Sequence, residues 1–257
     1  MKKTALITGA SAGLGVEFAK LFAQGGHNLV LIARRVDRLE SIAKELRAQF
    51  AVRVDVLGMD LEMAGAPQKI FDFTQRQGLQ IDYLVNNAGF GYLNDFLNEG
   101  MNHDTGMIMV NVMSLVELTK IFAANMVERN QGRILNIGST AGFQPGPFMA
   151  TYYASKAFVN SFSEALTYEL RRTGVTVTLS CPGPTRTEFG VRSGVDKKPL
   201  FKLGADTAES VAGEAYRAMH KGQRRVIHGF KNKISAVSVG LMPNAILLRV
   251  VEKLQGH

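Results

Sequence analysis

Short apolar runs alternate along the chain with longer segments in which apolar residues recur every three or four positions. The short runs predict buried strands, and the longer segments predict amphipathic helices. The predicted strands cover residues 5–8, 28–33, 52–59, 81–86, 133–137, 175–180 and 225–228. The predicted helices cover residues 14–24, 37–49, 66–77, 105–126, 151–172 and 207–220. This alternation is typical of βαβ units and predicts an α/β fold, in which a parallel sheet carries helices on both faces.

The sequence gives no reason to divide this fold into smaller units. The 257 residues are 46% hydrophobic and contain no repeat, low-complexity linker or shift in composition, so we predict one domain over residues 1–257. Residues 188–204 are irregular and rich in Gly, Lys and Pro, which predicts a mobile lid. The C-terminal segment, residues 230–257, has an uncharged stretch at 234–248 that is too short to span a membrane. We expect a core or dimer-interface helix there, with peripheral membrane contact at most.

Charge and rare residues restrict the class of ligand. The net charge of +8 favours polyanions, but the basic residues are scattered and no nucleic-acid-binding motif is present. We therefore expect a phosphorylated small molecule and no nucleic acid. The single cysteine, Cys181, excludes an internal disulfide and indicates a reducing compartment, so a cytoplasmic protein is expected. The five histidines lack metal-ligand spacing, and no metal site is predicted.

A glycine-rich turn joins the first predicted strand to the first predicted helix. It reads TGASAGLG over residues 8–15. Glycines allow the backbone to approach a pyrophosphate, and a helix N-terminus favours negative charge. A merely tight turn is the alternative. The candidate cofactor-binding residues of the turn are Gly9, Ser11, Ala12, Gly13, Leu14 and Gly15.

Two arginines, Arg34 and Arg35, follow the second predicted strand, where NAD-binding units carry an acid. Two guanidinium groups at this position indicate the 2′-phosphate of NADP. Arg34 is the better candidate for the phosphate, and Arg35 is placed to stack on the adenine. NADP(H) is therefore expected to be favoured over NAD(H), and solvated surface arginines are the alternative.

Further polar or glycine-rich residues follow other predicted strands. The carboxyl ends of parallel strands share one edge of the sheet, and ligands bind there where the strand order reverses, so these residues are expected to converge. Ala88 and Gly89 leave room for a flat cofactor, and the threonines can hydrogen-bond a carboxamide. An acid such as Asp60 is more often a helix cap than a ligand contact. The candidates are Asp60, Leu61, Asn87, Ala88, Gly89, Pro182, Gly183, Thr185 and Thr187.

Three polar side chains in one stretch point to proton transfer at an oxygen. Ser139 follows the strand at 133–137, while Tyr152 and Lys156 lie four residues apart on one helix face. A free phenol has a pKa of about 10 and becomes useful near neutral pH only beside a cation. Lys156 can supply that cation, and Ser139 can hydrogen-bond the reacting oxygen. An exposed Tyr–Lys pair on an amphipathic helix is the alternative.

Asn111 lies within a predicted apolar helix, where a buried amide without a partner would be costly. An exposed asparagine fits the pattern equally well.

Together these motifs resemble those of the short-chain dehydrogenase/reductase family, over residues 1 to about 190. The matching elements are TGASAGLG at 8–15, NNAG at 86–89, Asn111, Ser139, YYASK at 152–156 and PGPTRT at 182–187. The resemblance implies a Rossmann-like, doubly wound sheet of about seven parallel strands, with NAD(P) across its carboxyl edge. It also implies a homodimer or homotetramer.

The resemblance further implies four catalytic residues. Tyr152 would be the general acid or base, and Ser139 would hold the substrate oxygen. Lys156 would bind the nicotinamide ribose and lower the pKa of the phenol, and Asn111 would hold a water in a proton relay.

The expected function is NADP(H)-dependent hydride transfer to a carbonyl, or from a secondary alcohol, of a small lipophilic substrate. Phe143, Phe148, Phe189 and Leu200 suit a 3-oxoacyl or steroid-like compound. A non-catalytic NADP-binding regulator or scaffold is the alternative, and the intact Ser139, Tyr152 and Lys156 argue against it. A serine hydrolase would need a G-x-S-x-G elbow, which Ser139 lacks.

Overall fold

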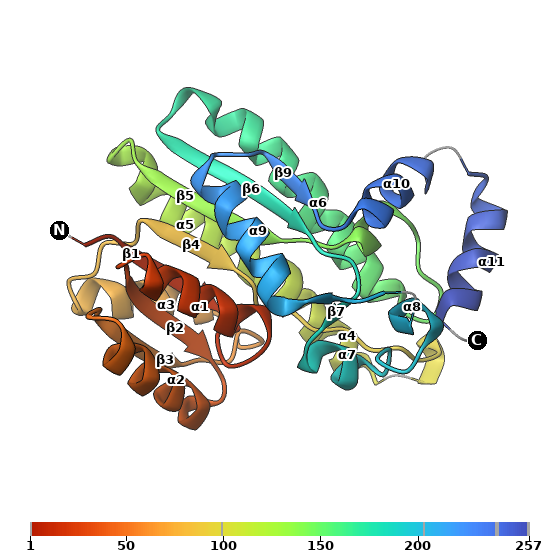
Figure 1. Cartoon of the computed structure of the whole chain (residues 1–257), viewed down its shortest axis with the longest axis horizontal. Coiled ribbons are helices and arrows are strands. Elements are labelled where there is room, and N and C mark those ends of the chain that lie inside the picture. The colour runs from red at the N-terminus through yellow and green to blue at the C-terminus, as the bar shows by residue number, and fades with distance from the viewer. Residues whose placement is uncertain (1, 99, 203, 240–241, 256–257) are drawn as a thin grey trace.

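The computed structural model describes residues 2–98, 100–202, 204–239 and 242–255, and shows the predicted α/β fold (Figure 1). Within these residues, seven parallel strands form one sheet in the order β3-β2-β1-β4-β5-β6-β9. The strands are β1 (Thr4–Thr8), β2 (Asn28–Ala33), β3 (Val54–Gly58), β4 (Tyr83–Asn86), β5 (Gly132–Ile137), β6 (Val175–Cys181) and β9 (Arg225–Ile227). The strand order reverses between β1 and β4, so the crevice at their carboxyl ends is where a ligand is expected.

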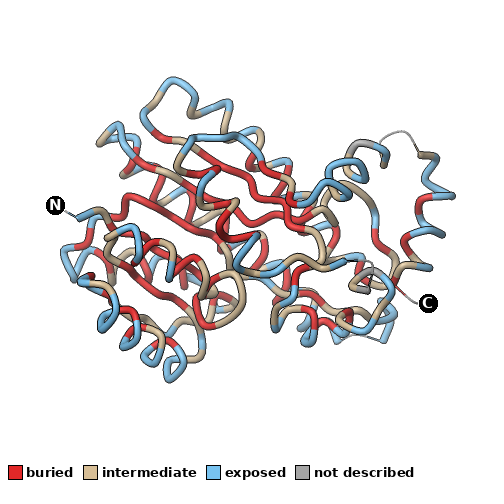
Figure 2. Tube along the Cα trace, in the orientation of Figure 1, coloured by how far each residue is buried: buried red, intermediate tan, exposed pale blue. Residues whose placement is uncertain are grey.

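Successive side chains of the central strands enter two separate cores. Ile7 and Leu31 belong to the core on one face, while Leu6 and Val30 belong to the core on the other. This period of two follows from the strand pleat, and burial on both faces explains why the strands read as unbroken apolar runs. Figure 2 shows the same strands as the most continuously buried part of the molecule.

Helices cover both faces of the sheet. One face carries α1 (Leu14–Gln24), α2 (Val36–Gln49) and α9 (Ala208–His220); the other carries α3 (Ala66–Arg76), α5 (Ser114–Glu128) and α6 (Ala150–Glu169). Short 3-10 turns lie at η1 (Phe96–Asn98), η3 (Thr140–Phe143) and η4 (Leu170–Arg172). Figure 1 shows α1 and α9 crossing the sheet on the near side.

The helix expected at 105–126 is longer and is widened at its centre. It runs through α4 (Met101–Ile108), the π-helical turn η2 (Met109–Met113) and α5. The whole run is long and apolar enough to cross a membrane, but half of its most apolar window is buried inside the protein. Leu118, Phe122 and Met126 pack in the core beneath it, which accounts for its apolar composition. Asn111 lies in the π turn, a feature that often marks functional positions.

The segment 188–204, which the sequence predicts to be an irregular lid, is partly helical, and its role as a lid stays a prediction. It contains α7 (Glu188–Ser193) and α8 (Pro199–Lys202), and its base is closed by β7 (Thr185–Arg186) pairing with β8 (Asp206–Thr207). The hydroxyl of Ser193 donates to the carbonyl of Phe189 at 2.8 Å, which closes α7 on itself. Elements this short carry too few residues to show a hydrophobic period. The side chain of Leu200 and the whole of residue 203 lie outside the described residues.

The C-terminal segment forms two helices, α10 (Phe230–Ser238) and α11 (Asn244–Gln255). Both lie beyond the carboxyl end of the sheet (Figure 1), and most of their surface is exposed (Figure 2). Leu247, Val251 and Gln255 are the buried residues of α11. Leu247 and Val251 pack with Met149 and Tyr153, so α11 covers the start of α6.

Candidate active site

The glycine-rich turn is held against the end of β4 by a polar network. The Thr8 hydroxyl accepts hydrogen bonds from the backbone N–H groups of Asn87 and Ala88, both at 3.0 Å. The Asn87 side chain donates to the Thr8 carbonyl at 2.9 Å. Gly9 has φ +65°, and a Cβ there would lie 2.9 Å from the Ala88 Cα, so no larger residue fits. The turn therefore presents bare backbone and the N-terminus of α1, as a dinucleotide pyrophosphate requires.

One cavity of about 610 Å³ extends from this turn to α11. Almost all of the predicted site residues line it: Gly9, Ser11, Ala12, Gly13, Leu14, Arg34, Arg35, Asp60, Leu61, Asn87, Ala88, Gly89, Ser139, Tyr152, Lys156, Pro182, Gly183, Thr185 and Thr187. Phe143 and Phe189 also line it. Gly15, Asn111 and Phe148 are not among its lining residues.

The two arginines after β2 have different surroundings from those expected. Arg34 forms ion pairs with two carboxylates, and its Nη1 lies 3.1 Å from Glu62 and 3.7 Å from Asp60. Arg35 instead reaches the glycine turn, where its Nη2 donates to the Ser11 hydroxyl at 3.1 Å. Its Nη1 pairs with Glu188 at 2.9 Å. Arg35 therefore contacts the glycine turn directly, whereas Arg34 lies against acidic side chains, and the choice of Arg34 for the 2′-phosphate stays a prediction.

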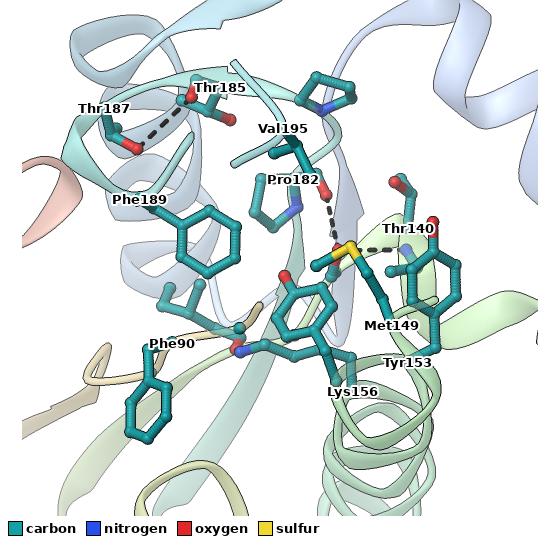
Figure 3. A pocket seen from close by; sticks show the side chains of 18 of the residues that line it. Phe90, Thr140, Met149, Tyr153, Lys156, Pro182, Thr185, Thr187, Phe189 and Val195 are labelled. Carbon is teal, nitrogen blue, oxygen red and sulfur yellow. Dashed lines mark hydrogen bonds between the residues drawn. The ribbon is translucent and has the colours of Figure 1, made fainter. Parts of the chain in front are cut away.

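Ser139, Tyr152 and Lys156 lie together beyond the end of β5. The phenol of Tyr152 lies beside the Ser139 hydroxyl, which favours the ionised form of the phenol. Lys156 Nζ donates to the Ile137 carbonyl at 2.8 Å and lies 6.0 Å from the centre of the Tyr152 ring. Lys156 is only 6% exposed, which excludes an exposed Tyr–Lys pair. In Figure 3, Lys156 extends from α6 into the cavity, opposite Phe189.

Burial governs the ionisation of this group. It raises the pKa of Tyr152 well above its ordinary value, and the hydrogen bond from Ser139 only partly opposes that shift. It lowers the pKa of Lys156 to about 8. In the protein alone, burial dominates the pKa of the phenol, and the Lys156 ammonium donates to the Ile137 carbonyl. The lowering of the phenol pKa by Lys156 stays a prediction. Tyr152 is thus a protonated acid at neutral pH, which suits proton donation to a carbonyl oxygen.

Asn111 is buried, at 1% exposed, and both of its amide N–H groups and its amide oxygen form hydrogen bonds. Its Nδ2 donates to the Phe90 carbonyl at 2.9 Å and to the Ser155 hydroxyl at 3.0 Å, and its Oδ1 accepts from the Phe90 N–H at 3.1 Å. A Cβ on Gly89 would lie 3.1 Å from that Oδ1 and 3.5 Å from Lys156 Nζ. The Asn111 side chain therefore holds the backbone at residues 89–90 beside Lys156.

Two residues that the sequence did not single out shape the same site. Asn160 donates to the Ser139 carbonyl at 3.0 Å and accepts from the Ser139 N–H at 3.4 Å. It lies four residues after Lys156, so the repeat of Tyr152, Lys156 and Asn160 on one helix face was an available signal. Gly91 leaves space for the Tyr152 ring, because a Cβ there would come within 2.7 Å of that ring.

Reduction should weaken as the pH rises through about 8. Above that value Lys156, whose pKa burial lowers to about 8, loses the charge that supports a forming phenolate. We expect kcat/KM for NADPH, which reports ionisations of the free enzyme, to be level below pH 8 and to fall above it. Initial rates of ketone reduction between pH 6 and 10 would show this. A profile that stays level to pH 10 would contradict the assignment to Lys156.

The fold and this site together define an oxidoreductase that uses a nicotinamide nucleotide. A model of the short chain dehydrogenase family matches residues 3–197, so the chain belongs to that family. It is 30% identical over 251 residues to a very-long-chain 3-oxoacyl-CoA reductase of Mus musculus, covering 96% of this chain and 78% of that protein.

Two solved structures are also similar. A short-chain dehydrogenase from Sphingobium yanoikuyae in complex with NADPH is 32% identical, with a TM-score of 0.81, covering 93% of this chain and 95% of that one. A bulky-bulky ketone specific alcohol dehydrogenase from Comamonas testosteroni is 31% identical, with a TM-score of 0.78, covering 93% of each chain.

Proposed function

We propose that this protein is an NADPH-dependent reductase of lipophilic ketones, of the 3-oxoacyl thioester type. The observation that carries the proposal is the position of the Tyr152–Ser139 pair. Both side chains line a cavity whose glycine-rich end suits a dinucleotide and whose other end is apolar.

The apolar end of the cavity supports a lipophilic substrate. The residues that line this end include Met149, Phe189, Val195, Leu247 and Val251. Phe189 packs on Tyr152, with the two ring centres 5.4 Å apart. The similarity to a very-long-chain 3-oxoacyl-CoA reductase supports a 3-oxoacyl thioester within that class. Two cationic side chains, Arg192 and Lys198, line the same cavity and complement the anionic carrier of such a thioester.

The chain's own residues supply the proton and fix the geometry. When bound, the nicotinamide nucleotide supplies the hydride. The Ser139 hydroxyl, fixed through its backbone by Asn160, positions the ketone oxygen beside the Tyr152 phenol. Tyr152 gives its proton to that oxygen, and the Lys156 ammonium stabilises the resulting phenolate. The Gly9–Gly15 turn would hold the pyrophosphate, and the Thr185 and Thr187 hydroxyls would meet the carboxamide.

The preference for NADPH is supported by charge. Arg34 and Arg35 both line the nucleotide end, and Arg35 contacts Ser11 of the glycine turn. Guanidinium groups bind a phosphate through two parallel donors, and NADH lacks the 2′-phosphate that they would bind.

The test is reduction of a long-chain and a short-chain 3-oxoacyl thioester with NADPH or NADH, followed as nucleotide oxidation. We expect kcat/KM to be at least about tenfold higher with NADPH and with the longer chain, each reflecting about 1.4 kcal/mol of added binding. Equal rates with NADH would overturn the cofactor assignment alone. Thermal stabilisation by NADPH without reduction of any ketone would favour the non-catalytic binding protein.

A further inference from the structure

The apolar half of the cavity contains one buried polar group that the proposed reaction does not use. Gln255, near the end of α11, is 1% exposed and lines the cavity. Its Nε2 donates to the Tyr153 hydroxyl at 3.0 Å, across 102 positions of sequence. Its Oε1 is buried and has no hydrogen-bond partner among the described residues.

Among residues 2–98, 100–202, 204–239 and 242–255, no hydrogen-bond donor is paired with that oxygen. One buried apolar cluster contains Tyr153, Met149, Val195, Leu247 and Val251. The polar side-chain group of this cluster is the Tyr153 hydroxyl, which already accepts a hydrogen bond from Gln255 Nε2. Gln144 is a second hydrogen-bond partner of that hydroxyl. An unsatisfied buried acceptor is costly, and a ligand that brings a donor to it recovers that cost.

The acceptor belongs to a residue that lines the same cavity as the reacting centre. Tyr153 follows Tyr152 in α6, and their ring centres are 6.0 Å apart. Gln255 contacts Tyr153 through its hydrogen bond to the Tyr153 hydroxyl. Both Tyr152 and Gln255 line the same cavity. The cavity therefore offers a substrate whose ketone meets Tyr152 a path past Tyr153 to the side chain of Gln255.

We propose that Gln255 and Tyr153 form a specificity site that accepts a hydrogen bond from a donor on the substrate. The substrate is then a lipophilic ketone that also carries a hydroxyl or an amide N–H along its body. The assignment deepens the proposed function and rests on it for the position of the ketone. A hydroxyl would belong to a hydroxylated apolar body, and an amide N–H to the pantetheine arm of a thioester.

The test compares matched ligands that differ only in the donor. One pair is a 3-oxoacyl thioester of N-acetylcysteamine and its S-alkyl counterpart of equal length, which lacks the amide. The other pair is a long-chain ketone with a terminal hydroxyl and the same ketone ending in a methyl group. Dissociation constants are measured by calorimetry on the protein saturated with NADP⁺, and kcat/KM is measured separately with NADPH.

In the wild-type protein, the donor-bearing member of at least one pair should bind about tenfold more tightly than its partner, as one buried hydrogen bond allows. The pair that shows the difference identifies the donor as hydroxyl or amide. The Gln255→Met variant, which keeps the side-chain volume and removes the acceptor, should abolish the difference and bind the apolar partner as before. Lys253→Met, an exposed position on the same helix, should behave as wild type.

Equal affinity within both pairs of wild-type measurements would overturn the proposal, whatever the variants do. A difference that persists in Gln255→Met would overturn it too, and would leave Gln255 with a packing role only. These results are distinct from failure of the proposed function. If no ketone is reduced but the binding difference appears and depends on Gln255, the specificity site stands and the reductase does not.

Discussion

Replacing Tyr152 with Phe should reduce turnover by about a hundredfold to ten-thousandfold, the contribution typical of a general acid. The substitution removes one hydroxyl and keeps the ring, so its packing on Phe189 remains. The Ser139 hydroxyl still accepts from the N–H of Ala141 at 3.1 Å and donates to the carbonyl of Pro182 at 3.4 Å. Affinity for NADPH should change little, because the glycine turn and the arginines after β2 are untouched. Steady-state rates and a thermal shift with NADPH would measure the two effects separately.

The control for this variant is Tyr168→Phe, on the same helix. Tyr168 is 65% exposed and lies well away from the cavity, so its loss of a hydroxyl should leave turnover intact. Near-normal turnover in Tyr152→Phe would show that another group donates the proton. A parallel loss of NADPH stabilisation would instead point to a damaged fold.

Replacing Gly15 with Ala should destabilise the protein and weaken nucleotide binding together. The added Cβ would overlap the Gly9 carbonyl oxygen and lie 2.9 Å from both the Ala10 Cα and the Asn87 Nδ2. Two of these three neighbours are backbone atoms of the glycine turn, which cannot move away without changing its shape. Overpacking of this kind costs about 1–3 kcal/mol, which corresponds to a fall in Tm of several degrees. NADPH affinity should fall at least about tenfold, because the displaced turn is the surface that holds the phosphates.

Gly100→Ala is the matched control for that substitution. Gly100 has φ −71°, which any residue adopts, and a Cβ there would meet no atom of the described residues within 4 Å. Thermal unfolding and NADPH titration of both variants give the comparison. If Gly15→Ala unfolds and binds NADPH as Gly100→Ala does, the close packing of the turn does not support the nucleotide site.

The elements that the sequence predicted well are those buried on two sides. Strands such as β2, expected at 28–33 and found there, are packed from both faces and so carry an unbroken apolar signal. The site was foreseeable for the same reason, since residues after parallel strands must meet at one edge. The proximity of Ser139, Tyr152 and Lys156 could be predicted because one residue follows a strand and the other two share a helix face.

The parts that the sequence did not predict depend on contacts between distant side chains. Nothing local to Arg35 shows that it turns to Ser11, or that Glu188 meets it from 153 residues away. The pairing of Gln255 with Tyr153 is of the same kind. The π turn around Asn111 was missed because an apolar helix pattern does not reveal one extra residue in a turn.

The pairing of Glu188 with Arg35 and Arg38 links the two ends of the cavity thermodynamically. Glu188 opens α7, and the next residue, Phe189, covers the Tyr152 ring. A bound anion that breaks the Arg35–Glu188 ion pair therefore weakens a contact that holds α7, and with it Phe189, in place. By thermodynamic linkage, a substrate that displaces Phe189 changes the affinity for that anion by the same factor. Because these side chains are partly exposed, the pair contributes at most about 1 kcal/mol, which limits this reciprocal effect to about fivefold.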